Sequence, residues 1–270
     1  MANYHFHVEL IKRSAGQSVV DRAAYITKAR LYDSYTGRIY DRRSCDARVL
    51  ASGVYLPDKA PLDYGDIQKL LTGLNSAETR SNAQMARSYN LSLPVELTQE
   101  QQATLAKEFA EKHFTREGYC VIFAIHLKEA SRSGRIGVSS LAPVNGLVEN
   151  PHLHMIVPFR MIGSDGFQRT KIASRITNQP EYLGMLRKSW ADMQNRTFAR
   201  MGLDVRVSHE SLSKQGIHRA PTPYLGVASL ALERKGVQTD RGELYRSTVR
   251  QNAKLRGLSH SLERGHGPTR

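Results

Sequence analysis

Two of the ten histidines flank a leucine in the segment His152-Leu153-His154. Side chains alternate along an extended strand, so both imidazoles lie on one face of a strand here and Leu153 lies on the other. His126 lies near the end of the preceding apolar run, and it joins the pair if the two strands are neighbours in a sheet. Three neutral imidazoles bind a divalent ion and leave positions open for substrate oxygens. This spacing favours a catalytic metal site.

Two other interpretations of these histidines have to be weighed. A second His-x-His segment, His5-Phe6-His7, shows that the spacing also arises by chance in this chain. A closed structural zinc site would need a fourth cysteine or histidine nearby. Cys45 and Cys120 lie far apart and outside any Cys-x-x-Cys spacing, so they indicate free thiols in a reducing compartment.

A metal with open positions in a basic protein would polarise a phosphodiester for attack by water or by a side chain. Tyr25 lies on a predicted helix, and Tyr32 follows seven residues later on nearly the same face. Asp21 lies one helical turn before Tyr25 and is a possible base or orienting group. Residue types alone do not distinguish Tyr25 from the other members of a set of 12 tyrosines.

The charge of the chain indicates the class of partner. Lys and Arg number 39 against 25 Asp and Glu, which gives a net charge of +14. Such an excess favours polyanions, either nucleic acid or an anionic membrane surface. No segment combines a basic face with a large apolar face, and no apolar run reaches the length of a membrane span. With its mixed N-terminal segment, the sequence predicts a cytoplasmic protein without membrane insertion.

Hydrophobic periodicity predicts an α+β fold. Thr98 and Gln101 form a capping box that opens a helix. Strands are expected at 3–10, 49–56, 89–94, 119–127, 152–159 and 204–208, and helices at 17–30, 66–74, 98–114 and about 183–202. These elements suggest a central antiparallel sheet with helices packed mainly on one face. We expect a main domain over residues 1–215, with a Gly/Ser-rich loop at 128–150, and a basic, partly flexible C-terminal extension over 216–270.

Several segments, taken in this order, resemble the mobilisation relaxases of the MobA/MobL type, which are single-tyrosine members of the HUH endonuclease superfamily. The resemblance covers roughly residues 1–235. It is carried by Tyr4-His5-Phe6, Arg13-Ser14-Ala15-Gly16-Gln17-Ser18, Ala23-Ala24-Tyr25-Ile26, Leu93-Pro94-Val95-Glu96-Leu97, Ala124-Ile125-His126, Glu149-Asn150-Pro151-His152-Leu153-His154, Gly216-Ile217-His218-Arg219-Ala220-Pro221 and Leu225-Gly226.

The resemblance implies a concrete activity. Tyr25, favoured over Tyr32, would nick one DNA strand at the transfer origin of a plasmid or integrative element. The products would be a 5′-phosphotyrosine link and a free 3′-hydroxyl, and the same residue would reseal the strand after conjugative transfer. His126, His152 and His154 would hold a divalent ion, with Mn²⁺ or Mg²⁺ favoured.

The resemblance also implies partners: single-stranded or hairpin DNA at the transfer origin, accessory DNA-binding proteins and a type IV secretion coupling protein. Export would accompany the DNA. The candidate DNA-binding residues are Arg13, Gln17, Ser18 and Tyr32. Two features depart from the family: the loop after His126 is long, and Asn90 stands where similar proteins often have an acidic residue. The alternatives are an HUH replication initiator or transposase, and a non-enzymatic protein that binds single-stranded DNA.

Overall fold

The computed structural model describes residues 4–44, 48–128, 150–171, 179–223 and 225–265. Cys45 and nearly all of the predicted loop at 128–150 lie outside these residues. The chain divides into two compact units, and the described residues up to His209 belong to the first, those from Glu210 onward to the second.

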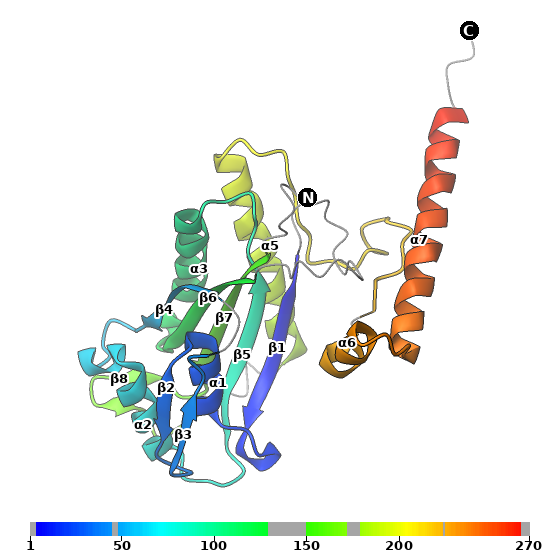
Figure 1. Ribbon diagram of the computed structural model, residues 1–270. Helices are drawn as coiled ribbons and strands as arrows, with labels where there is room; N and C mark the ends of the chain where they lie inside the picture. Colours follow the sequence, from blue (N-terminus) through cyan, green and yellow to red (C-terminus); the bar gives the residue numbers. More distant parts are fainter. Residues whose placement is uncertain (1–3, 45–47, 129–149, 172–178, 224, 266–270) are drawn as a thin grey trace. The chain divides into compact units, whose positions relative to one another are not determined.

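The first unit is built on a five-stranded antiparallel sheet (Figure 1). Its order is β1 (Phe6–Lys12), β5 (Gln84–Ser92), β7 (Asn150–Pro158), β6 (Val121–Lys128) and β4 (Arg48–Tyr55). The predicted pairing of the two apolar strands is confirmed, since β6 and β7 are neighbours and His126 lies opposite His152. The α+β class with a central antiparallel sheet is confirmed as well.

Helices cover both faces of this sheet, whereas the sequence suggested mainly one. On one face, α3 (Gln99–His113) and α5 (Pro180–Arg200) pack against side chains such as Phe123 and Ile125. On the other, α1 (Val19–Thr27) and α2 (Ile67–Ala77) pack against Ile122 and Ala124. The reason is that β6 is apolar on both sides, and a strand of this kind has to be buried on both faces.

The helix predicted over 17–30 is shorter in the structure. Its N-cap is Ser18, whose hydroxyl accepts from the backbone of Val20 and Asp21. It ends at Thr27 because Lys28 adopts a left-handed conformation with φ of 53°. A hairpin of β2 (Arg30–Asp33) and β3 (Arg38–Asp41) follows, in a stretch where the sequence analysis placed no strand.

Substitution of Ser18 by alanine is expected to destabilise the protein by about 1–2 kcal/mol. The change removes the cap and the hydrogen bond of 2.7 Å that the hydroxyl donates to Asp33. Urea denaturation of the wild-type protein and of the variant measures the difference in the free energy of unfolding. Ser76→Ala is the control, because in the described part of the chain the Ser76 hydroxyl bonds only to the carbonyl of Thr72 within α2. Unchanged stability combined with weaker DNA binding would instead support the predicted DNA contact of Ser18.

One prediction about the C-terminal half is wrong. Residues 204–208 do not form a strand, because the backbone of Val207 is bound at both its N–H and C=O by the side-chain amide of Asn195, at 2.9 and 2.8 Å. The segment from 216 onward, predicted as a basic, partly flexible extension, contains α6 (Gly226–Arg234) and α7 (Asp240–Gly265). Within this second unit, Glu233 of α6 accepts from Arg246 of α7 at 2.8 Å.

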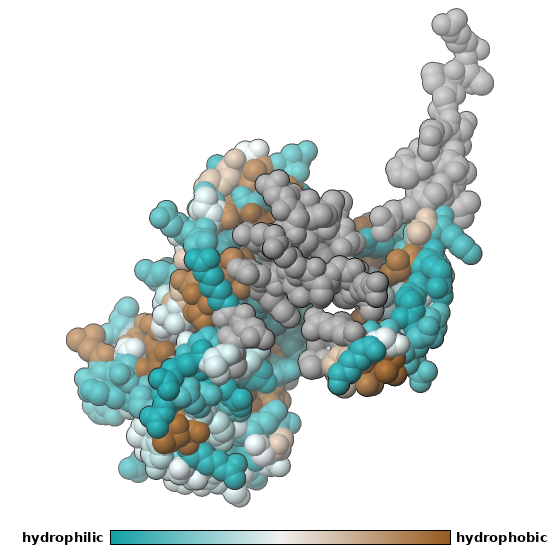
Figure 2. All heavy atoms as spheres, viewed as in Figure 1, coloured by the Kyte–Doolittle hydropathy of each residue, from teal (hydrophilic) through white to brown (hydrophobic). Residues whose placement is uncertain are grey.

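The remaining described elements are short. They are the 3₁₀ turns η1 (Arg13–Ala15), η2 (Leu62–Gly65) and η3 (Thr115–Glu117), and the hairpin of β8 (Ile162–Gly163) and β9 (Gly166–Phe167). Among the described residues, no helix is both long enough and apolar enough to span a membrane. Figure 2 shows a mainly hydrophilic surface over α1, α2, β2 and β3, where the hydrophobic spots are small and separated. Such a surface favours a polar or charged partner.

Candidate metal centre and nucleophile

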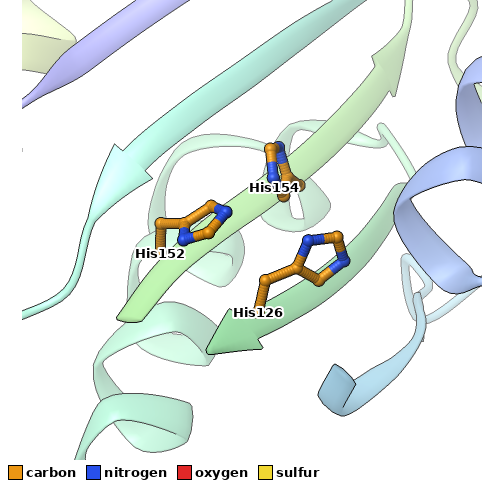
Figure 3. A group of neighbouring side chains, drawn as sticks. All are labelled: His126, His152 and His154. Carbon is orange, nitrogen blue, oxygen red and sulfur yellow. The ribbon is translucent and has the colours of Figure 1, made fainter. Parts of the chain in front are cut away.

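Three imidazoles converge where β6 and β7 pair (Figure 3). His126 lies opposite His152, and His154 follows two residues later on the same face of β7. One ring nitrogen from each residue lies within 4.8 Å of the others. The ring centroids are 4.6 to 5.4 Å apart. The cluster predicted from the sequence therefore exists, and it lies on the sheet face that α1 and α2 cover.

A backbone carbonyl orients one of these rings. The Nε2 atom of His126 is hydrogen-bonded to the carbonyl oxygen of Ile26 in α1. Because a carbonyl only accepts, Nε2 carries the proton and Nδ1 is left with a free lone pair. Metal-binding histidines commonly use a carbonyl in this way to set the tautomer. The contact also attaches the cluster to the residue next to Tyr25.

Burial keeps the imidazoles of His126 and His154 in the form that binds metal. His126 is 1% exposed, and burial lowers its pKa to about 4. Burial, followed by the charges of His152 and His126, lowers the pKa of His154 to about 2. Both side chains are neutral at neutral pH, which is the state that metal coordination requires.

Tyr25 lies on α1 and is 43% exposed, so its phenol is accessible to a large substrate. The ammonium group of Lys28 lies 4.3 Å from the centroid of its ring. Arg22 lies three residues before Tyr25 and Lys28 three residues after it, just beyond the end of α1, and their charges reach His154. Sequence reasoning did not single out these two cations, although their spacing of three residues on either side of Tyr25 could have identified them.

Asp21 and Asn90, the two positions considered in connection with a general base, lie in different surroundings. Asp21 is bound by the guanidinium group of Arg42 at 2.7 and 2.8 Å, so its carboxylate is held in an ion pair. Asn90 of β5 lies directly opposite His154, next to the cluster. An amide at this position can donate and accept hydrogen bonds but cannot take up a proton.

The predicted DNA-binding residues lie near the start of α1 and along the hairpin that follows it. Arg13 donates to Asn75 at 3.0 Å, and Gln17 accepts from the backbone of Lys12 at 2.8 Å. Ser18 caps the helix, whereas Tyr32 is 48% exposed. The first three side chains therefore have roles within the protein, and DNA contact by any of the four stays a prediction.

The model of the MobA/MobL family matches residues 17–235, a range that includes Tyr25 and all three histidines of the cluster. The chain belongs to the MobA/MobL family. Two relatives are the probable mobilization protein MobA of Bifidobacterium longum (strain NCC 2705), at 27% identity, and mobilization protein A of Escherichia coli, at 28%. The alignments cover 98% and 97% of this chain, but only 50% and 35% of the relatives. The chain thus spans half or less of the length of these relatives.

Among solved structures, one described as "Molecular Basis of Vancomycin Resistance Transfer in Staphylococcus aureus" has a TM-score of 0.63 and 28% sequence identity. The similarity covers 77% of this chain and 98% of that one. The similarity to this solved structure is therefore one of fold as well as of sequence. The family resemblance identified from the sequence is confirmed by the family match.

Proposed function

We propose that this chain is the DNA-nicking part of a mobilisation protein, a relaxase that cuts one strand at a transfer origin and later reseals it. The observation that supports this most directly is the cluster of His126, His152 and His154 attached to the Tyr25 helix through the carbonyl of Ile26. Membership of the MobA/MobL family agrees with the proposal, since the curated relatives are named mobilization proteins.

The cluster fits a divalent ion. Its three ring nitrogens converge, the rings of His126 and His154 are neutral, and the Nδ1 lone pair of His126 is kept available by the Ile26 carbonyl. Bound there, Mn²⁺ or Mg²⁺ would supply positive charge that polarises the scissile phosphate. Lys28, next to the Tyr25 ring, would add cationic charge that helps to draw in a phosphate, whereas Arg22 is already paired with Glu9 at 2.7 Å.

Tyr25 would perform the transesterification. Its phenolic oxygen forms a bond to phosphorus while the bond from phosphorus to the 3′ oxygen breaks, which leaves a 5′-phosphotyrosine and a 3′-hydroxyl. The phenol proton passes to water at the half-exposed ring, and the departing 3′ oxygen takes up a proton from solvent. One phosphodiester is exchanged for another, so the reverse attack by a 3′-hydroxyl restores the strand.

The partners follow from this function. We propose that the substrate is single-stranded or hairpin DNA at a transfer origin, in keeping with the charge of +14. Accessory DNA-binding proteins and a type IV secretion coupling protein would assemble with the complete mobilisation protein. The protein would act in the cytoplasm and leave with the DNA.

A nicking assay tests the proposal. Labelled single-stranded fragments that tile the DNA flanking the gene are incubated with the protein and Mn²⁺ or Mg²⁺, then separated on a denaturing gel. We expect a covalent adduct with 3′-labelled DNA and a shortened, protein-free band with 5′-labelled DNA, both abolished by EDTA. Tight DNA binding without an adduct under any metal would indicate the non-enzymatic alternative. An adduct at a replication origin instead would indicate an initiator.

A further inference from the structure

A basic pocket lies at the end of the sheet away from the histidine cluster. It forms between the start of β5 and the end of β7, and its volume is about 410 Å³. Four cationic side chains and one carboxylate line it: Arg80, Arg160, Arg169, Lys171 and Glu78. The positive charge exceeds the negative by three, so the pocket suits an anion.

Two of the cations are held rigidly by the carboxylate. Glu78 is 2% exposed, and its Oε1 lies 2.7 Å from Nε of Arg160 and also contacts the ammonium group of Lys171. Arg160 donates further to the carbonyl of Gln168, and Lys171 to that of Gln84, both at 2.8 Å. One buried carboxylate balances only one of these two charges. The wall of the pocket is therefore preorganised and retains a positive charge.

The other two cations face solvent. Arg80 and Arg169 are exposed, and within the described part of the chain neither side chain forms an ion pair or a hydrogen bond to protein. Each guanidinium group is thus available to a ligand, and its planar fork matches two phosphate oxygens. The neutral side chains of Thr79 and Asn82 add hydrogen-bonding groups at the rim.

The separation between the pocket and the histidine cluster fits a single DNA strand that contacts both. His154 and Phe159, which lines the pocket, are five residues apart along β7 and its extension, and this corresponds to ~17 Å. Successive phosphates of one strand in duplex DNA rise by ~3.4 Å, so one strand spans this distance in about five nucleotides. We propose that the pocket binds the phosphodiester backbone of the DNA whose scissile phosphate lies at the histidine cluster. The inference rests on the proposed nicking function.

Removal of the two solvent-facing cations tests this role. The double variant Arg80→Gln/Arg169→Gln and the wild-type chain are titrated into a fluorescein-labelled 20-nucleotide oligothymidylate and a labelled DNA hairpin, without metal. We expect about 10-fold weaker binding of the variant at ~100 mM salt. For the single strand, the slope of log affinity against log salt concentration should become shallower by ~1.4, because each lost phosphate contact contributes about 0.7 to the slope.

The control is Lys107→Gln/Arg196→Gln, which removes the same charge from exposed positions on α3 and α5, the helices that cover the sheet face opposite the histidine cluster. Lys107 forms only a long surface ion pair with Glu111, at 3.7 Å. The control variant should change affinity by less than about twofold, since it lowers only the general field of the protein. Equal losses in both double variants, or a slope unchanged in the pocket variant, would overturn the proposal. The proposal would also be overturned if the pocket variant lost binding to thymidine 5′-monophosphate but still bound the oligonucleotide as tightly as the wild type. That result would indicate a site for free nucleotides.

These measurements are independent of catalysis. Binding is measured without metal and without cleavage, whereas the nicking function depends on a covalent adduct at Tyr25. If the wild-type chain nicks DNA but the pocket variant binds DNA as tightly as the wild type, the pocket proposal alone is refuted. If the pocket variant binds DNA more weakly, as expected, but the wild-type chain never forms a covalent adduct, the nicking function alone is refuted.

Discussion

Replacement of Tyr25 by phenylalanine is expected to abolish the covalent protein–DNA adduct, with a loss of at least about 1000-fold in nicking rate. The change removes only the hydroxyl oxygen that would attack phosphorus. The ring stays in place beside Lys28, and Ile26 still binds His126, so the metal centre and the fold are retained. Nicking is measured as adduct on a denaturing gel, and DNA affinity by fluorescence anisotropy, where we expect a change of less than about twofold.

Tyr32→Phe is the matched control, because Tyr32 is the second candidate nucleophile and is similarly exposed, at 48% against 43% for Tyr25. This variant should form the adduct at nearly the wild-type rate. An adduct that survives in Tyr25→Phe and disappears in Tyr32→Phe would transfer the nucleophilic role to Tyr32. Mass spectrometry of the tyrosine-containing peptide after nuclease digestion identifies the modified residue directly.

His154→Ala is expected to weaken divalent metal binding by at least about 100-fold and to abolish nicking. His154 has the shortest ring-to-ring distances in the cluster, at 4.6 Å to His126 and 4.8 Å to His152. Without it, two imidazoles remain to hold the ion. Isothermal titration calorimetry with Mn²⁺ measures affinity, and repeats with Mg²⁺, Ni²⁺ and Zn²⁺ rank the ions that three imidazoles accept.

The control for this variant is His7→Ala. His7 belongs to the second His-x-His segment and its side chain is largely exposed on β1. We expect metal affinity and nicking to stay within about twofold of wild type. If His154→Ala lowers DNA binding and thermal stability as much as nicking, and metal affinity is unchanged, the three histidines serve the structure and not catalysis.

Local sequence determined the parts of the site that depend on backbone periodicity. Alternation along one strand is sufficient to place His152 and His154 on the same face. The capping box of Thr98 and Gln101 is confirmed at the start of α3, because a cap depends only on neighbouring residues. The two long apolar strands, β6 and β7, were likewise evident, and so were the helices that begin near Ser18 and Asp66.

The tertiary structure decided which residues meet. His126 joins the other histidines only through the register of β6 and β7, and its ring is set by Ile26, which lies 100 residues away in sequence. The cations of the basic pocket come from three separate segments that meet only in the folded chain. Periodicity shows which face a side chain takes, but it contains no information on which distant face lies opposite. The pair His152 and His154 was therefore predictable from its spacing. The contact that joins the cluster to the Tyr25 helix, through His126, required the packing of α1 on the sheet.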